Sequence, residues 1–212
     1  PTLVSAFQAG LDIHRATAAE VFGVPLEDVT SDQRSTAKTV NFGIMYGMQA
    51  YGLSRDTGMP RAEATKFIER YMNQFQGVRR YLDETLKFAQ THGYAASLYG
   101  RRRYVPDITG GGPRRMAAER AAINMPLQGT ASDIMKIAMI RVAERLAHSG
   151  LRAEMLLQVH DELLFETPVS EMEALAALVE DTMESGGELS VPLGVEMSYG
   201  PSWEEMTDFV RP

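Results

Sequence analysis

Residues 34–47 read Arg34-Ser-Thr-Ala-Lys38-Thr-Val-Asn-Phe42-Gly-Ile-Met-Tyr46-Gly47. Four distinctive side chains recur in this stretch at intervals of four residues. Each four-residue step along an α-helix turns only about 40°, so Arg34, Lys38, Phe42 and Tyr46 lie along one ridge. One face of the predicted helix therefore carries two cations followed by two aromatic rings.

A capping box marks the start of this helix. Thr30 is followed three residues later by Gln33, and we expect a helix over residues 31–48. An arginine and a lysine one turn apart can hold two oxygens of a polyphosphate, and the rings beyond them can meet a sugar and a base. The alternative is a surface helix with solvated cations, whose Phe42 and Tyr46 face a core. Spacing alone leaves both interpretations open.

The composition is that of a soluble globular protein. Hydrophobic residues make up 44% of the 212, enough for a substantial core. The chain has no cysteine, which excludes disulfides and thiolate metal sites and favours a cytoplasmic location. No apolar run is as long as a membrane span or resembles a signal peptide, so we expect no membrane association.

Charge is distributed unevenly along the chain. Residues 1–150 hold 19 Lys and Arg against 14 Asp and Glu, whereas residues 151–212 hold 2 against 14. The basic part can follow a phosphate backbone, and the acidic part contains carboxylates for a metal ion. The alternative for the acidic end is a solvated surface.

A glycine divides a basic segment from a β-like one. Residues 94–99 are β-like, Gly100 predicts a turn, and the following segment contains Arg102 and Arg103 beside tyrosines. These arginines can bind backbone phosphates, although a basic hairpin tip without a partner would have the same sequence.

Pro126 is predicted to separate two helices, at 114–125 and 130–147. Arg120, Asn124 and Gln128 lie four residues apart across this break. Such a row can recognise acceptors in a DNA minor groove, but alone it is equally typical of helix caps. Near the end of the chain, residues 191–197 are expected to form a strand.

Two hydrophobic segments near the end of the chain are separated by three ionisable residues. They form a predicted hairpin over residues 155–166, and only His160-Asp161-Glu162 separates them. Turns tolerate Asp for ordinary hydrogen-bonding reasons. This triplet is less ordinary, because neighbouring carboxylates repel each other unless a cation lies between them.

Taken together, these motifs closely resemble the DNA polymerase I family, also called family A. The residues that carry the resemblance are Arg34-x3-Lys38-x3-Phe42-Gly43-x2-Tyr46-Gly47, the row from Arg120 to Gln128 with Gly129-Thr130, and Gln158-Val-His160-Asp161-Glu162. Asp12-Ile13-His14, Gly100-Arg101-Arg102-Arg103-Tyr104-Val105-Pro106 and Asn124-Met-Pro126 match as well. The resemblance covers essentially the whole chain.

The resemblance implies an α+β fold, part of a right-hand polymerase. Residues 1–93 would be mostly the helical fingers subdomain, and residues 94–212 mostly the palm, an antiparallel sheet flanked by helices. The implied activity is template-directed DNA synthesis, in replication or repair, with primer-template DNA and deoxynucleoside triphosphates as partners. The parent enzyme is expected to act as a monomer with two Mg²⁺ ions.

The resemblance also implies a role for individual residues. Those near the triphosphate are His14, Arg34, Lys38, Phe42 and Tyr46, with Arg34, Lys38 and His14 at the phosphates, Phe42 near sugar and base, and Tyr46 at the template base. Those near DNA are Arg102, Arg103, Arg120, Asn124, Gln128 and His160. Asp161 would bind metal with Glu162 assisting beside it, so that Asp161, Glu162, His160 and Lys38 form the catalytic group.

One motif of the family is missing. Its first palm motif carries a metal-bridging aspartate, which would lie just upstream of Pro1. We therefore expect part of a longer enzyme, inactive by itself. Two alternatives stay open: a nucleotide- or DNA-binding module without chemistry, and a metal-dependent nuclease built on the hairpin tip, which would not need the triphosphate-binding ridge.

Overall fold

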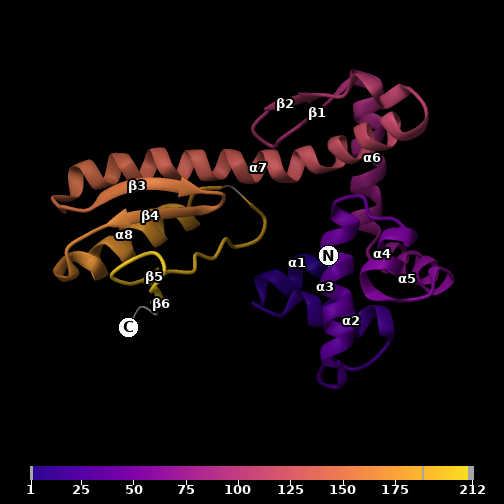
Figure 1. Ribbon diagram of the computed structural model, residues 1–212, viewed down its shortest axis with the longest axis horizontal. Helices are drawn as coiled ribbons and strands as arrows, with labels where there is room; N and C mark the ends of the chain where they lie inside the picture. Colours follow the sequence, from indigo (N-terminus) through magenta and orange to yellow (C-terminus); the bar gives the residue numbers. More distant parts are fainter. Residues whose placement is uncertain (1, 188, 210–212) are drawn as a thin grey trace. The chain divides into compact units, whose positions relative to one another are not determined.

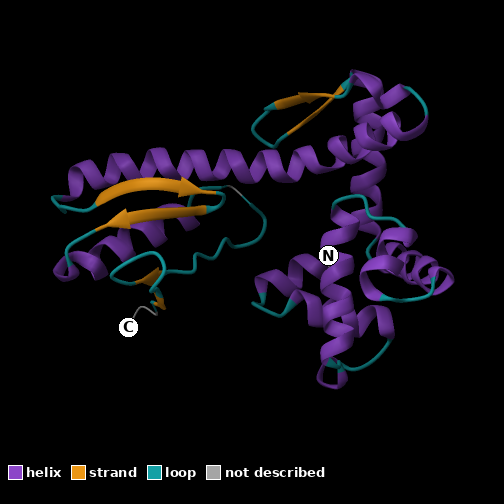
Figure 2. Ribbon diagram, viewed as in Figure 1, coloured by secondary structure: helices purple, strands orange, loops and turns teal. Residues whose placement is uncertain are grey.

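The computed structural model describes residues 2–187 and 189–209, and it consists of helices with short two-stranded antiparallel sheets (Figure 2). This confirms the predicted α+β class. Packing divides the chain into two units, one up to Thr130 and one from Ala131 onward. Helix α7 (Gly112–Ser149) runs from the first unit into the second (Figure 1).

The first unit is mainly helical. Its elements before α7 are α1 (Thr2–Gln8), α2 (Ile13–Phe22), the 3-10 turn η1 (Leu26–Asp28), α3 (Ser31–Met45), α4 (Ala50–Thr57), α5 (Arg61–Gln74), α6 (Gln76–His92), β1 (Tyr94–Ala96), β2 (Arg102–Tyr104) and η2 (Pro106–Thr109). One core joins α2 to α5 through Val21, Val40, Ile44, Leu53, Phe67 and Tyr71. A second core joins α6 and the β1–β2 hairpin to α7 through Ala89, Ala95, Ile108 and Ala122.

Helix α3 begins where its capping box predicts. The Gln33 N–H donates to Thr30 Oγ1 at 3.2 Å, and the Thr30 N–H donates to Gln33 Oε1 at 2.9 Å. The helix ends at Met45, three residues before the predicted end at 48. Gly47 has φ +76° and the Met48 N–H donates to the Gly43 carbonyl at 2.7 Å, so a left-handed turn closes the helix.

The predicted break at Pro126 is wrong, because α7 continues through it. Pro126 cannot donate a hydrogen bond to the Ala122 carbonyl one turn earlier. Packing supports the helix on the N-terminal side of the defect, since Ala122 and Met125 are buried in the second core. The Tyr81 hydroxyl of α6 also donates to the neighbouring Ile123 carbonyl at 2.8 Å.

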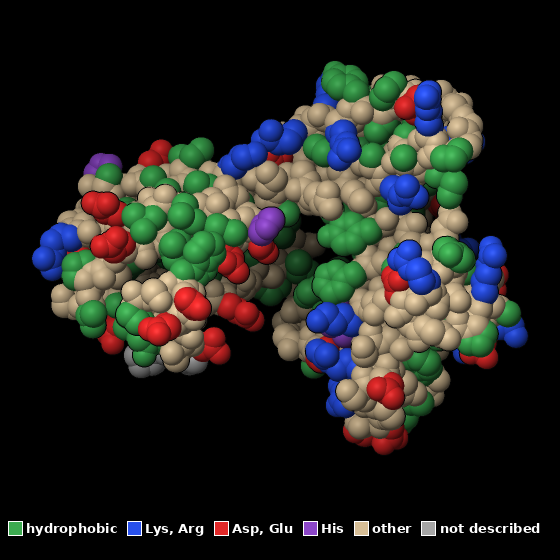
Figure 3. Space-filling view, in the orientation of Figure 1, with side chains coloured by type: hydrophobic (Ala, Val, Ile, Leu, Met, Phe, Trp, Pro, Cys, Tyr) green, Lys and Arg blue, Asp and Glu red, His purple; other side chains and the backbone are tan. Residues whose placement is uncertain are grey.

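The second unit packs the end of α7 against a hairpin and a helix. Its further elements are β3 (Glu154–Val159), β4 (Glu162–Glu166), η3 (Val169–Glu171), α8 (Met172–Glu184), β5 (Ser198–Tyr199) and β6 (Thr207–Asp208). Val142, Ala153, Leu175 and Val179 form its core, with Met155 and Phe165 packed against them. Acidic side chains gather over this unit in Figure 3, as the charge distribution predicts.

The predicted strand over residues 191–197 does not form. The Val195 N–H donates to the Glu184 carboxylate at 3.3 Å instead of to a neighbouring strand. The pairing begins one residue later, where β5 and β6 align Ser198 with Asp208. This bond occupies one of the backbone donors that the expected strand pairing would use.

Pro126→Ala should raise the free energy of unfolding by about 2 kcal/mol, because it restores a helical N–H donor and a residue of higher helix propensity. Urea unfolding followed by circular dichroism measures the change. Pro113→Ala is the matched control, since Pro113 lies in the first turn of the same helix, where no intrahelical bond is lost. Equal changes in the two variants would contradict the assigned defect.

Candidate nucleotide-binding and catalytic site

The exposed face of α3 carries the predicted ridge. Ala37, Val40 and Ile44 are buried on the opposite face, whereas Phe42 is 52% and Tyr46 42% exposed. The alternative in which both rings face a core is therefore wrong. Two large aromatic side chains on a helix surface leave their faces available to a planar ligand.

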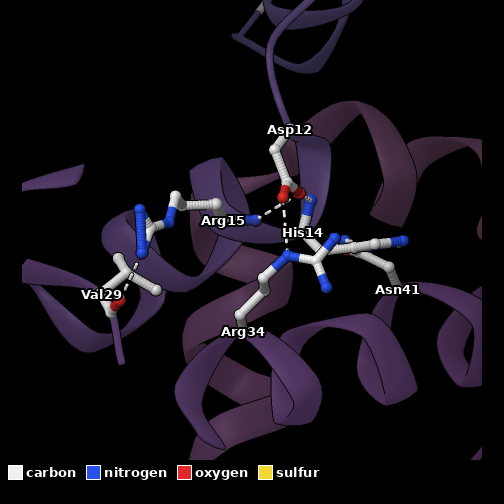
Figure 4. Close-up of polar contacts among 6 residues, drawn as sticks. All are labelled: Asp12, His14, Arg15, Val29, Arg34 and Asn41. Atoms are coloured by element: carbon white, nitrogen blue, oxygen red, sulfur yellow. Dashed lines mark hydrogen bonds and ion pairs between the residues drawn. The ribbon is translucent and has the colours of Figure 1, made fainter. Parts of the chain in front are cut away.

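Asp12 joins the start of α2 to the ridge (Figure 4). Its Oδ1 accepts the backbone N–H groups of His14 and Arg15, both at 3.0 Å, and so caps α2. Its Oδ2 accepts Nε of Arg34 at 2.6 Å. The two terminal amino groups of Arg34 make no hydrogen bond to the residues that the structure describes, so they can bind a phosphate as a fork.

The Asp12 carboxylate is kept ionised by these donors. Partial burial raises the pKa of Asp12, but the hydrogen bonds from Arg34, Arg15 and His14 and the positive charge of Arg34 outweigh it. The pKa of Asp12 therefore lies below its ordinary value.

His14 lies between α2 and the ridge. Asn41 Nδ2 is 3.2 Å from His14 Nδ1 and also donates to Thr17 Oγ1 at 3.0 Å. The imidazole ring is tilted against the Phe42 ring with centroids 5.5 Å apart. Burial lowers the pKa of His14, the Arg34 and Lys38 cations lower it further, and the Asp12 carboxylate opposes them. The result is a histidine biased toward its neutral form.

Lys38 completes the cationic half of the ridge. It is exposed, and within residues 2–187 and 189–209 it forms no ion pair. An ammonium group one turn from a fixed guanidinium provides a second donor for a polyphosphate.

The structure brings the end of the ridge together with the row on α7. A Cβ added at Gly47 would lie 3.4 Å from Cγ of Arg120, so Gly47 packs beside this arginine. Tyr46, at the end of the ridge, is the residue directly before Gly47. Arg120 and Gln128 are exposed on the continuous helix. Asn124 Oδ1 is buried without a hydrogen-bond partner, which leaves an acceptor for a donor from outside the chain.

Arg102 and Arg103 lie on the exposed strand β2. Cζ of Arg102 is 4.5 Å from the centre of the Tyr94 ring, a cation–π contact that orients the guanidinium. Both arginines are accessible to a phosphate backbone.

The β3–β4 hairpin presents His160, Asp161 and Glu162 at its exposed tip. Val159 pairs with Glu162, so the loop has two residues, one fewer than predicted. His160 has φ +54°, and Gln158 Nε2 donates to its carbonyl at 2.8 Å. No group of three His, Asp or Glu side chains able to hold a metal ion occurs in the described part of the chain.

Sequence reasoning missed two residues that organise the ridge. Asp12 was not expected to hold Arg34, and Asn41 was not singled out. Aspartate is one of the residues preferred at a helix N-cap, and Asp12 stands directly before the helix that begins at Ile13. The contact of Asn41 with His14 joins residues 27 positions apart and leaves no local signal.

Comparison with known proteins places this chain in a family. The model of DNA polymerase family A matches residues 1–205, so the chain belongs to DNA polymerase family A. DNA polymerase I of Chloroflexus aurantiacus is 50% identical over 206 residues, which cover 97% of this chain and 22% of that protein. DNA polymerase I of Deinococcus radiodurans is 52% identical over 204 residues, covering 96% and 21%. The chain thus spans about a fifth of the length of these curated relatives.

A solved structure resembles the chain closely. It is the polymerase domain of Pol1 from M. smegmatis in complex with DNA primer-template and dNTP. It superposes with a TM-score of 0.90 at 43% identity, covering 96% of this chain and 36% of that one. No helix among the described residues is long and apolar enough to cross a membrane.

The pKa of His14 should lie below 6.5 when followed by NMR titration of its ring protons. Because the folded-state value is the lower one, stability is complete above the unfolded pKa and falls as pH drops toward the folded pKa. Asp12→Asn, which keeps a capping side chain, should lower the pKa of His14 further by removing the opposing charge. Glu119→Gln removes another carboxylate partner of an arginine, one that is partly exposed, and should leave the pKa of His14 unchanged.

Proposed function

We propose that this chain is the part of a DNA polymerase that binds the incoming deoxynucleoside triphosphate and contributes to the centre of template-directed DNA synthesis. The observation that carries the proposal is the exposed ridge of α3, with Arg34 held by Asp12 and its two terminal amino groups free of hydrogen bonds to the described residues. Membership of DNA polymerase family A supports the same activity.

The ridge suits a triphosphate from one end to the other. Arg34 and Lys38 would bind phosphate oxygens, and neutral His14 would add a ring nitrogen as a hydrogen-bonding group. Phe42 would pack near the sugar and base, and Tyr46 would occupy the template-base position. Phenylalanine at position 42 would favour discrimination against dideoxynucleotides, as the family resemblance implies.

A second set of residues would hold primer and template. Exposed Arg102, Arg103 and Arg120 would bind backbone phosphates. Gln128 and the unpartnered oxygen of Asn124 would meet groups in the minor groove. His160 would approach the primer end. The proposal includes a monomeric parent enzyme.

The donor set at the hairpin tip fits a hard cation. Asp161 offers a carboxylate of the kind that Mg²⁺ prefers, with Glu162 beside it, and the other ligands would come from substrate phosphates, water and the remainder of the enzyme. A pair of bound ions would neutralise phosphate charge and stabilise the leaving pyrophosphate. The chain's own contribution is to position the triphosphate and the primer end, which supplies much of the catalysis of phosphoryl transfer.

The proposed subdomains follow the family: residues 1–93 mostly fingers and residues 94–212 mostly palm. Movement of the ridge helix toward a correctly paired base would bring Arg34 and Lys38 onto the triphosphate. Such closure would couple base pairing to catalysis.

A binding module without chemistry is the second candidate. It is favoured by one observation, that the described residues contain no cluster of three metal-ligating side chains. The two candidates differ in whether Asp161 is needed for nucleotide incorporation.

The test is a chimeric polymerase in which this chain replaces the matching segment of the Chloroflexus aurantiacus relative. Single-nucleotide incorporation into a primer-template should depend on a divalent ion, and Asp161→Asn should abolish it while primer-template affinity persists. Asp107→Asn, outside the hairpin, is the control. Incorporation at the parental rate by Asp161→Asn would remove Asp161 from the metal role, and a folded chimera that binds DNA without incorporation would favour the binding module.

Lys38→Ala in the same chimera should weaken triphosphate binding by about 1.5–3 kcal/mol, the loss of a charge-assisted contact. Pre-steady-state kinetics measure the apparent Kd for the nucleotide. Lys136→Ala removes an exposed lysine that contacts only Ser132 among the described residues, and it should leave this Kd unchanged. The same Kd in Lys38→Ala and the parent would exclude the proposed phosphate contact.

A further inference from the structure

The β1–β2 hairpin has one face that the core does not use. Its register pairs Tyr94 with Tyr104 and Ala96 with Arg102, which places these four side chains on one face. Ala95, on the other face, is 1% exposed and packs in the core with α6 and α7. Two tyrosines and an arginine are therefore directed away from the core.

Helix α6 extends this face with two more rings. Phe88 and His92, one turn apart, stack with centroids 4.1 Å apart and an interplanar angle of 22°. The Tyr94 ring lies 5.4 Å from Phe88 and 5.9 Å from Tyr104, so four rings form one continuous cluster. Figure 1 shows the hairpin beside the end of α6 from which these residues come. We call Phe88, His92, Tyr94, Arg102 and Tyr104 the aromatic–arginine face.

The cluster is open to solvent. Tyr104 is 70% and Phe88 40% exposed. The hairpin is also attached through the Ala95 face, the bond from the Val105 N–H to the Gly93 carbonyl and the bond from the Leu98 N–H to Thr130. Exposed rings are suited to stacking with planar groups.

Positive charge accompanies the rings. The Arg102 guanidinium lies over Tyr94, and Arg103 follows it on the exposed strand. Among the described residues neither arginine is paired with a carboxylate. Aromatic faces beside unneutralised cations match a ligand that alternates planar bases with negative phosphates.

We propose that the aromatic–arginine face binds single-stranded nucleic acid. Unpaired bases stack on Tyr104 and Phe88, and Arg102 neutralises a phosphate beside them. Duplex DNA does not satisfy this face, because its bases are already stacked and paired. In the proposed polymerase the strand would be template that has not yet been copied, a step that rests on the proposed function.

The test uses the 212-residue chain and a fluorescein-labelled oligothymidylate of about twelve nucleotides, with binding followed by fluorescence anisotropy. Phe88→Ala/Tyr104→Ala should weaken binding at least tenfold, since each stacked base contributes on the order of 1–3 kcal/mol. Tyr104→Phe, which keeps the ring, should bind as the parent does. Trp203→Ala removes a 54%-exposed aromatic ring of the second unit and should have no effect. Circular dichroism and urea unfolding establish that each variant is folded.

Two further measurements distinguish the contribution of charge to binding from that of base stacking. Arg102→Gln should reduce the slope of log affinity against log salt by about 0.7, the value for one phosphate contact on a single strand. Polyglutamate of similar length, which carries charge without bases, should bind the parent and the double-alanine variant equally. Unchanged oligothymidylate affinity in the folded double variant, or an equal loss for polyglutamate, would overturn the proposal.

Failure of this proposal is distinguishable from failure of the proposed function. In the chimeric polymerase, the double variant should incorporate a nucleotide normally when the template overhang is one nucleotide. Its apparent affinity for a primer-template with a twelve-nucleotide overhang should fall several-fold relative to the parent chimera. Equal affinities for the long overhang would overturn the single-strand site, while incorporation itself would still support the polymerase.

Discussion

The carboxylate of Asp12 accepts hydrogen bonds from the N–H groups of His14 and Arg15 and from Nε of Arg34. The arrangement of the ridge depends on these three bonds. The first two bonds fix the start of α2 and therefore the direction of His14. The third holds the Arg34 guanidinium by Nε and leaves its two terminal amino groups for a phosphate. An ion pair this exposed adds only about 0–1 kcal/mol to stability, so its consequence is geometric. Asp12 thus orients His14 of α2 and Arg34 of α3 relative to each other.

Packing beneath α3 explains why the ridge side chains face outward. The buried positions include Ala37 and Gly43, and a Cβ at Gly43 would lie 2.5 Å from Sδ of Met48. Small residues inside allow α2 and the Met48 turn to approach the helix closely. The same close approach lets Asn41 reach His14 and Thr17 from the edge of the ridge. Small residues on the inner face of α3 thus permit close packing, while the large ridge side chains lie on its outer face.

Local signals predicted most of the first unit, and non-local contacts account for the errors. The capping box at Thr30 and the four-residue ridge depend on neighbours within one turn, and the structure contains both as expected. The break at Pro126 was wrong because the core around Ala122 and Met125 outweighs one missing hydrogen bond. The strand over residues 191–197 was wrong because Glu184, eleven residues before Val195, captures its N–H. The contact of Asn41 with His14 could not be predicted for the same reason, since it depends on how two helices meet.

The tip of the β3–β4 hairpin shows how strand pairing places reactive groups. A two-residue loop requires a positive φ, and His160 adopts φ +54° where glycine would be unstrained. A left-handed conformation costs an ordinary residue about 1–2 kcal/mol, and strained backbone of this kind clusters at functional sites. The loop is so short that the pairing of Val159 with Glu162 determines the positions of His160 and Asp161. A longer loop would relieve the strain but would let the carboxylate move independently of the sheet. The strained short connection therefore favours an accurately placed Asp161, which is what the proposed ligation of a metal ion beside a primer end would demand.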